Sequence, residues 1–360
     1  MPSNGVDIRV RVALLVGSLG MGGAERQVIE LAERLRWRGH NVVLLSLAGS
    51  KQNEWPTSIE VLRLGMTRSP ATIPLAFARA YCFLREFRPD VAHSHTKHAN
   101  LAARVLRLAG VAPCVVSTLH SVQDGGRGRM LLYRWTDPLA AHTTAVSRAV
   151  AERYVEARAA PREKCSVITN AIDTGLFRPD VARARYRVSR GFVWLAAGRV
   201  TEAKDYPNLL EAFRRVRDAG ANAELWIAGE GGESMPAAPG VRWLGLQRDM
   251  PALFDAADAF VLSSAWEGLP LVVGEAMAME KAVVATRAGG TAELVGECGT
   301  LVEPRNPRAL AAAMLAVMRW SEEERAALGK RARKRIEERF GWNATVEKWE
   351  RLYERLIEHR

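Results

Sequence analysis

The stretch AFVLSSAWEGLPLVVGEAMAMEKAVVATR, residues 259–287, contains a β-rich run, a loop, an apolar helix and a second β-rich run. This is the order of a βαβ unit, in which a helix connects two parallel strands of one sheet. Pro270 suits the first helical position because it lacks the amide hydrogen that would be unpaired there. We therefore expect a parallel α/β sheet, with the loop before Pro270 at the carboxyl end of a strand.

Two glutamates, Glu267 and Glu275, flank this predicted helix start. Glu267 is expected on the loop that leaves the sheet, and Glu275 about one turn inside the helix. The amides near Leu271 and Val272 would point out of the helix start, where a phosphate is favoured. One carboxylate could reach hydroxyls beside that phosphate and the other could reach hydroxyls on its far side, which fits a nucleotide sugar. Two solvated glutamates around a helix N-cap are the plainer alternative.

The same alternation of strands and helices begins twice in the chain. It starts at VRVALLVG near the N-terminus and again at FVWLAAG, residues 192–198, which predicts two Rossmann-like, doubly wound parallel sheets. The join is expected near residues 170–190, where NAIDTGLFRPD has the turn residues and the proline of a linker. The expected domains are 1–175 and 176–340, followed by a final helix, 341–360. Two sheets that face each other across a cleft could hold two substrates, which suits group transfer.

Composition and charge narrow the class of protein. No apolar run approaches the ~18 residues of a membrane span, and the N-terminal MPSNGVDIRV lacks a signal-peptide core, so a cytoplasmic protein is expected. Residues 1–180 carry 24 lysines and arginines against 15 acidic residues, whereas residues 181–360 carry 27 against 25. A basic front half can attract anionic lipid or a phosphorylated substrate. We treat peripheral contact with the inner face of a membrane as a separate expectation, with ordinary solvated arginines as the alternative.

Nucleic acid, metal and cofactor are not expected as partners. The chain has no zinc finger, no RNA-binding sheet signature and no interleaving of basic and aromatic residues. Its four cysteines are widely spaced without a CxxC pair, which argues against a zinc site or a disulfide framework. None of its aspartates forms a DxD pair. The cysteines are expected to be reduced and mostly buried.

Glycines and two cations stand at further strand ends. GSLGMGGAER, residues 17–26, ends the first strand and opens the first helix, and Gly22 and Gly23 leave the backbone open to a phosphate or sugar. Its spacing departs from GxGxxG, and a tight turn is an equal reading of the segment alone. In the second half, Arg199 follows a strand and Lys204 precedes a helix. Such cations would stabilise a departing diphosphate, unless they are simply solvated.

Histidines gather at strand ends in the first half. His120 closes CVVSTLH, and its neutral imidazole could accept a hydrogen bond from a sugar hydroxyl or position the acceptor. The segment DVAHSHTKHAN could be read as a metal site, but His93 and His95 have strand-alternate spacing and no carboxylate follows nearby. Histidines with a purely structural role are the more frequent case, and His95 and His98 are alternatively expected to line the acceptor pocket.

In order and spacing, a series of motifs resembles the retaining nucleotide-sugar glycosyltransferases of glycosyltransferase family 4 (glycosyl transferases group 1), which have the twin-Rossmann GT-B fold. The resemblance covers nearly the whole chain. The segments that carry it are GGAER, STLH, AVS, VITNAID with FRP, AAGR, LLEAF, WIAGEG, WLG, EGLPLVVGEAM, AVVATRAGGTAELV and GTLVEP.

The resemblance implies a role for each candidate residue. Arg199, Lys204 and the helix-start amides would bind the diphosphate, Glu267 would face the donor sugar, and Glu275 would hold the ribose. His120 would lie near the sugar and act with Glu267, Arg199 and Lys204 as the catalytic set. The remaining substrate-binding positions are Gly22, Gly23, Leu246 and Gln247 beside the base, Gly268, His95 and His98. No metal is implied, because cations and helix dipoles do the work of a divalent ion.

The implied activity is that of a retaining hexosyltransferase. It would move a sugar from a nucleoside diphosphate, UDP favoured, to a lipid-linked or polysaccharide acceptor in cell-surface glycan synthesis. The first domain would bind the acceptor and the second the nucleotide sugar, and the last helix, with Trp342 and Trp349, would pack back toward the first. A nucleotide-sugar epimerase and a non-catalytic nucleotide-sugar-binding subunit are the alternatives. Asn170-Ala171 replaces the usual Asn-Gly, and EGGESMPAAPG is short, which leaves the donor open.

Overall fold

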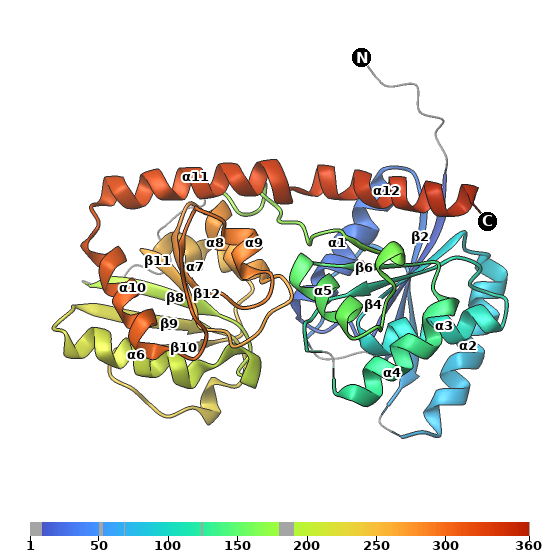
Figure 1. The fold of residues 1–360 in the computed structure, drawn as a ribbon, viewed down its shortest axis with the longest axis horizontal. Coiled ribbons are helices and arrows are strands. Elements are labelled where there is room, and N and C mark those ends of the chain that lie inside the picture. Colours follow the sequence, from blue (N-terminus) through green and yellow to red (C-terminus); the bar gives the residue numbers. More distant parts are fainter. Residues whose placement is uncertain (1–8, 50–52, 68, 124, 180–190, 360) are drawn as a thin grey trace, which may run out of the picture. The chain divides into compact units, whose positions relative to one another are not determined.

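The computed structural model describes residues 9–49, 53–67, 69–123, 125–179 and 191–359. It divides into two compact units, Met1–Thr169 with Asn343–Arg360, and Asn170–Trp342. Each unit contains one parallel sheet with helices packed against it (Figure 1). The two sheets that the sequence predicts are confirmed. Residues 180–190 of the expected linker lie outside the described residues.

The first unit contains a seven-stranded parallel sheet of order β3-β2-β1-β4-β5-β6-β7. Its strands are β1 (Arg11–Val16), β2 (Asn41–Ala48), β3 (Val61–Met66), β4 (Val91–His95), β5 (Val115–Leu119), β6 (His142–Ala145) and β7 (Cys165–Val167). Its helices are α1 (Gly23–Trp37), α2 (Thr72–Phe87), α3 (Lys97–Leu108), α4 (Arg127–Thr136), α5 (Arg148–Glu156) and α12 (Trp342–Glu358).

The helices of the first unit cover both faces of its sheet. Apolar residues of α2 and α3 pack over one face, against Ala13, Leu15 and Ala92. Parallel crossovers are right-handed, and α1 leads from β1 toward one edge while α3 leads from β4 toward the other. Because of this, α1 lies on the opposite face from α3. Helix α12 shares the face of α1, since its side chains contact His93, which alternates with Ala92 along β4.

The second unit contains a six-stranded parallel sheet of order β10-β9-β8-β11-β12-β13. Its strands are β8 (Phe192–Ala197), β9 (Ala223–Ala228), β10 (Val241–Gly245), β11 (Ala259–Leu262), β12 (Ala282–Thr286) and β13 (Thr300–Val302). Its helices are α6 (Tyr206–Asp218), α7 (Met250–Ala256), α8 (Leu271–Ala278), α9 (Thr291–Val295), α10 (Pro307–Arg319) and α11 (Glu322–Phe340). A 3-10 turn, η4 (Glu202–Lys204), precedes α6.

Two local predictions need correction. Pro270 is the N-cap residue of α8 rather than its first helical residue, and the helix begins at Leu271. The cysteines are not mostly buried, because Cys82 is exposed and only Cys114 is fully buried. None of the helices within the described residues combines the length and the apolar character that spanning a membrane requires.

Candidate functional site

An ion pair between Lys204 and Glu267 lies at the carboxyl ends of β8 and β11. The Lys204 Nζ and Glu267 Oε1 atoms are 2.6 Å apart, and the two side chains are 19% and 14% exposed. The hydroxyl of Ser264 donates to the same carboxylate oxygen over 2.7 Å. The hydroxyl of Ser263 in turn donates to the carbonyl of Lys204 over 2.8 Å. Both charged groups are therefore held in place by the strand end that carries the serines.

Three glycines let the backbone approach this pair closely. A Cβ on Gly289, whose φ is +53°, would lie 1.8 Å from the carbonyl oxygen of Glu267. A Cβ on Gly198 would lie 2.6 Å from Cε of Lys204, and one on Gly229 would lie 2.1 Å from the Gly198 carbonyl oxygen. Positive φ and this lack of space both favour glycine. The Gly290 amide donates to the carbonyl of Gly268 over 2.9 Å, which ties the two loops together.

The remaining candidates of the second unit lie at the same end of the sheet. Arg199 is exposed directly after β8, and Glu275 is 6% exposed inside α8. The N-cap residue of α8, Pro270, makes no side-chain hydrogen bond to the helix, so the amides of Leu271 and Val272 lie at a helix N-terminus that its own N-cap residue leaves uncapped. Leu246 and Gln247 follow β10. The side-chain amide of Gln247 donates to the backbone carbonyl of Leu244, and this bond shapes the turn where the nucleotide base is expected.

In the first unit, hydrogen bonds to side chains of other segments hold the backbone of the loop after β1. Gly22 is the N-cap residue of α1, with φ of −119°, and Gly23 begins the helix. The indole of Trp55 donates to the Gly22 carbonyl over 3.3 Å, and the Gly17 amide donates to the hydroxyl of Thr96 over 3.2 Å. Gly22 therefore needs no left-handed backbone, and its own amide donates to the Gly20 carbonyl over 2.7 Å. Gly23, the first residue of the helix, is exposed.

His95 and His120 contact each other at the ends of β4 and β5. Nδ1 of His95 and Nε2 of His120 are 3.0 Å apart, and one ring donates to the other. His95 is only 3% exposed, and its Nε2 is buried without a hydrogen-bond partner among the described residues. His98 is exposed on α3. The structure thus brings His95 together with His120.

Burial keeps these histidines neutral. It lowers the pKa of His120 to about 4 and holds the pKa of His95 well below its usual range, with His93 and His120 adding to the effect on His95. In a neutral pair one ring must donate and the other accept, so the tautomers of His95 and His120 are linked.

His93 belongs to the segment that we considered as a metal site from the sequence. In the structure it connects the sheet to α12. Its Nδ1 is 2.6 Å from the hydroxyl of Tyr353, and its Nε2 is 2.7 Å from the hydroxyl of Thr118. Its ring centroid lies 4.4 Å from that of Trp349. Among the described residues, no group of three or more His, Cys, Asp or Glu side chains is arranged to hold a metal ion.

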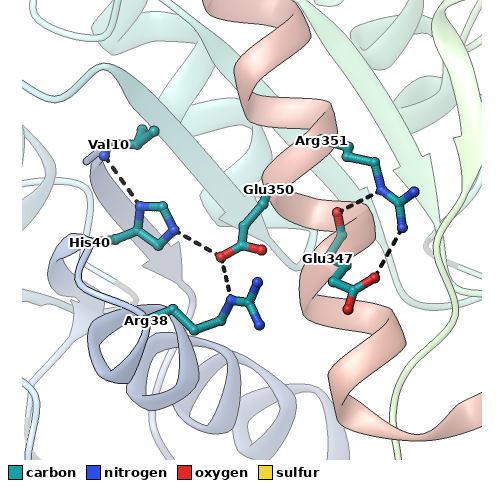
Figure 2. Close-up of polar contacts among 6 residues, drawn as sticks. All are labelled: Val10, Arg38, His40, Glu347, Glu350 and Arg351. Atoms are coloured by element: carbon teal, nitrogen blue, oxygen red, sulfur yellow. Dashed lines mark hydrogen bonds and ion pairs between the residues drawn. The ribbon is translucent and has the colours of Figure 1, made fainter. Parts of the chain in front are cut away.

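Glu350 of α12 provides a second attachment to the first unit (Figure 2). Its carboxylate accepts from Nε of Arg38 over 2.6 Å and lies 3.0 Å from Nε2 of His40. The Val10 amide donates to the other ring nitrogen of His40, so the proton of a neutral His40 is on Nε2 and points to Glu350. Helix α12 is therefore attached to the first unit at two places, at His93 of β4 and at the turn between α1 and β2.

Comparison with known proteins agrees with this architecture. The family model described as Glycosyltransferase Family 4 matches residues 21–176, and the one described as Glycosyl transferases group 1 matches residues 191–319. The chain is a glycosyltransferase with the GT-B fold. The Escherichia coli UDP-Gal:alpha-D-GlcNAc-diphosphoundecaprenol alpha-1,3-galactosyltransferase is 28% identical to it over 227 residues, which are 54% of this chain and 57% of the relative.

Solved structures share the fold over almost the full length. Sucrose-phosphate synthase from Thermosynechococcus elongatus superposes with a TM-score of 0.84 at 20% identity, over 97% of this chain and all of that chain. Anabaena HepE, solved in complex with UDP and glucose, superposes with a TM-score of 0.81 at 21% identity, over 96% and 99%. At these identities the likeness shows the fold.

Sequence reasoning did not identify three groups of the site. Ser264 and Gly289 contact Glu267, and Tyr353 contacts His93. The serine could have been found, since it stands three residues before Glu267 at a strand end. The other two contacts join segments that only the fold brings together.

Proposed function

We propose that this glycosyltransferase moves a hexosyl group, with retention, from a nucleoside diphosphate sugar to a hydroxyl of a lipid-linked or polysaccharide acceptor in cell-surface glycan synthesis. UDP is the favoured nucleotide. The observation that carries the proposal is the Lys204–Glu267 pair at the strand ends of the second unit, beside exposed Arg199 and the uncapped start of α8. The E. coli relative named for a UDP-galactose donor and HepE in complex with UDP support the nucleotide.

In this account, two cations and a helix start bind the diphosphate. An ammonium group has three N–H donors, so the bond to Glu267 leaves Lys204 able to reach a phosphate oxygen as well. Arg199 supplies a second permanent charge, and the amides of Leu271 and Val272 add the dipole of α8. Charge grows on the diphosphate as the sugar–phosphate bond breaks, and fixed cations stabilise that charge.

The carboxylates bind sugar hydroxyls on either side of the diphosphate. Glu267 accepts from Lys204 and Ser264 through Oε1, which directs Oε2 to the donor sugar. Glu275 takes the ribose hydroxyls. Gly22, Gly23, Leu246, Gln247 and Gly268 supply backbone and base contacts.

His120 contacts the sugar as a neutral ring, and His95 orients it from behind. His95 is buried, so we assign it to the His120 ring rather than to the acceptor itself. The exposed His98 remains a candidate acceptor contact.

Retention follows if the acceptor attacks the face from which the diphosphate departs. The bond from the anomeric carbon to the phosphate oxygen breaks, and a bond to the acceptor oxygen forms on that face. The acceptor proton passes to the leaving diphosphate. No metal is required, because Arg199, Lys204 and the α8 dipole neutralise the departing charge. The reaction takes place in the cytoplasm, with the basic first unit close to a membrane.

A panel of nucleotide sugars, assayed for hydrolysis and for transfer, tests the proposal. A UDP-sugar should be consumed fastest, and NMR of the product should show the anomeric configuration of the donor. Conversion of the donor sugar to its epimer without transfer would assign an epimerase instead. An inverted product would contradict same-face attack.

A further inference from the structure

Exposed apolar side chains gather on three helices of the first unit. Among the described residues, nine large hydrophobic side chains are exposed, and seven of them belong to α2, α3 and α4. The other two are Trp37 and Leu176. Scattered surface leucines are ordinary, whereas a cluster on neighbouring helices indicates a binding surface.

Helix α4 carries the centre of this cluster. Leu131, Leu132 and Trp135 are 43%, 44% and 71% exposed. Trp135 stands three and four positions after the two leucines, so the three side chains share one helix face. The opposite face of α4 is buried through Tyr133, whose ring lies under the guanidinium of Arg104 in α3. The exposed face is thus an additional apolar surface that the core does not need.

Helices α2 and α3 carry the other four exposed apolar side chains of this group. Ile73 and Leu75 are exposed at the start of α2, and Val105 and Leu108 are exposed on α3. Both helices pack over one core cluster, on the same face of the sheet, and α3 also packs against α4. Figure 1 shows the three helices grouped along one side of their sheet. We call this set, the exposed faces of α2, α3 and α4, the basic-apolar face.

The charges of the basic-apolar face are almost all positive. The three helices contain eight lysines and arginines and a single acidic residue, Glu86. Seven of the eight cations are at least partly exposed, because only Arg104 is buried. Arg127 and Arg134 flank the apolar stripe of α4. Helices that combine leucine and tryptophan with surrounding arginines suit the interface of an anionic membrane.

We propose that the basic-apolar face docks on an anionic lipid surface, with Trp135, Leu131 and Leu132 entering the headgroup layer and the flanking arginines contacting lipid phosphates. This rests on the proposed function, because a lipid-linked acceptor is presented at such a surface. A second copy of the chain is a poor occupant. In a two-fold dimer the same patch meets itself, so the arginines of the two copies would repel each other.

Vesicle co-sedimentation at low salt tests the docking face. The full chain should bind vesicles of phosphatidylcholine mixed with phosphatidylglycerol and should not bind phosphatidylcholine alone. Trp135→Ser should weaken binding about tenfold, since most of an indole leaves the interface. Arg127→Gln and Arg134→Gln should each weaken it roughly fivefold, and added salt should weaken it further.

Trp37→Ser provides the matched control. Trp37 is 87% exposed at the end of α1, on the other face of the sheet, and it also has arginines as neighbours. One of them, Arg38, is paired with Glu350. This variant should bind vesicles as strongly as the wild type. Both tryptophans are exposed, so thermal unfolding should show unchanged stability for both variants.

Three results would overturn the proposal. The first is equal loss of binding in the Trp37 and Trp135 variants. The second is equal binding to charged and neutral vesicles. The third is a dimer in light scattering that Trp135→Ser dissociates, which would assign the face to a second copy. Failure of the proposed function is separate, since it would appear as absence of nucleotide binding while vesicle binding persists.

Discussion

Replacing Lys204 with alanine should damage both the stability of the second unit and its turnover, for two different reasons. Among the described residues, the variant leaves the Glu267 carboxylate with Ser264 as its remaining side-chain donor, in a site where Glu267 is 14% exposed. Removing one partner of a fully buried pair costs about 3–5 kcal/mol. Partial exposure of both side chains screens the pair, so about 2 kcal/mol is expected here. For a domain of this size that corresponds to a fall of roughly 4–8 °C in Tm.

The turnover effect should be larger than the stability effect. Loss of one fixed charge from the departing diphosphate should lower kcat by at least about 100-fold. The double variant Lys204→Met with Glu267→Gln separates the two roles. It removes both charges together, so much of the stability should return while the activity remains lost.

Calorimetric unfolding and single-substrate kinetics provide the assay, with Arg214→Ala as the control. Arg214 also pairs with a glutamate, Glu211, but its side chain is 59% exposed on α6. Its removal should leave both Tm and kcat close to those of the wild type, because an exposed ion pair is screened by water. Full activity in Lys204→Ala would refute the assignment of this lysine to the diphosphate. An activity loss that the double variant restores would show that Lys204 serves only the fold.

Three further predictions concern the glycine turn and the histidines. Gly289→Ala should lower stability by more than about 2 kcal/mol and reduce activity, because the new Cβ would collide with the backbone before α8. The control is Gly39→Ala, which is also at positive φ but in open space and should cost only about 1 kcal/mol. His95→Phe should lower kcat by up to about 100-fold with KM little changed, and His95→Gln should retain more activity; equal activity of all three proteins would contradict a positioning role. Burial lowers the pKa of His120 and His142 to about 4, so below pH 6.5 the unfolded chain takes up protons that the folded chain resists. Each ring should therefore lower the stability of the fold by about 3 kcal/mol as the pH falls from 6.5 to 4. Denaturant unfolding across this range should show a smaller slope for His142→Gln.

Periodicity was sufficient to predict both parallel sheets. Strand β8 is an apolar run between turn residues, and β12 is apolar apart from Thr286. The helix after Ser321 has an N-cap with acids in its first turn, which the structure completes as a capping box. Helix α4 was not predicted. Its exposed Leu131, Leu132 and Trp135 place apolar residues on both faces, which removes the amphipathic pattern. The exposed apolar side chains that obscure the helical pattern of α4 are the same ones that form its proposed membrane-binding surface.

The parts of the site could be predicted better than the contacts between them. His95 pairs in register with Thr118, so the parallel order of β4 and β5 alone brings His95 close to His120. The Lys204–Glu267 bond joins residues 63 positions apart, and sequence reasoning gave each of them a separate partner. The contact between His93 and Tyr353 spans 260 positions, and it depends on how the last helix packs. No local pattern contains that information.

Isothermal titration of the chain with UDP, GDP and ADP, repeated with the Arg199→Ala and Lys204→Ala variants, tests the central claim most directly. We expect UDP to release the most heat and to bind the two variants at least about tenfold more weakly than the wild type. Absence of binding heat with all three nucleotides, or equal binding by the wild type and both variants, would contradict a diphosphate site at the strand ends of the second unit.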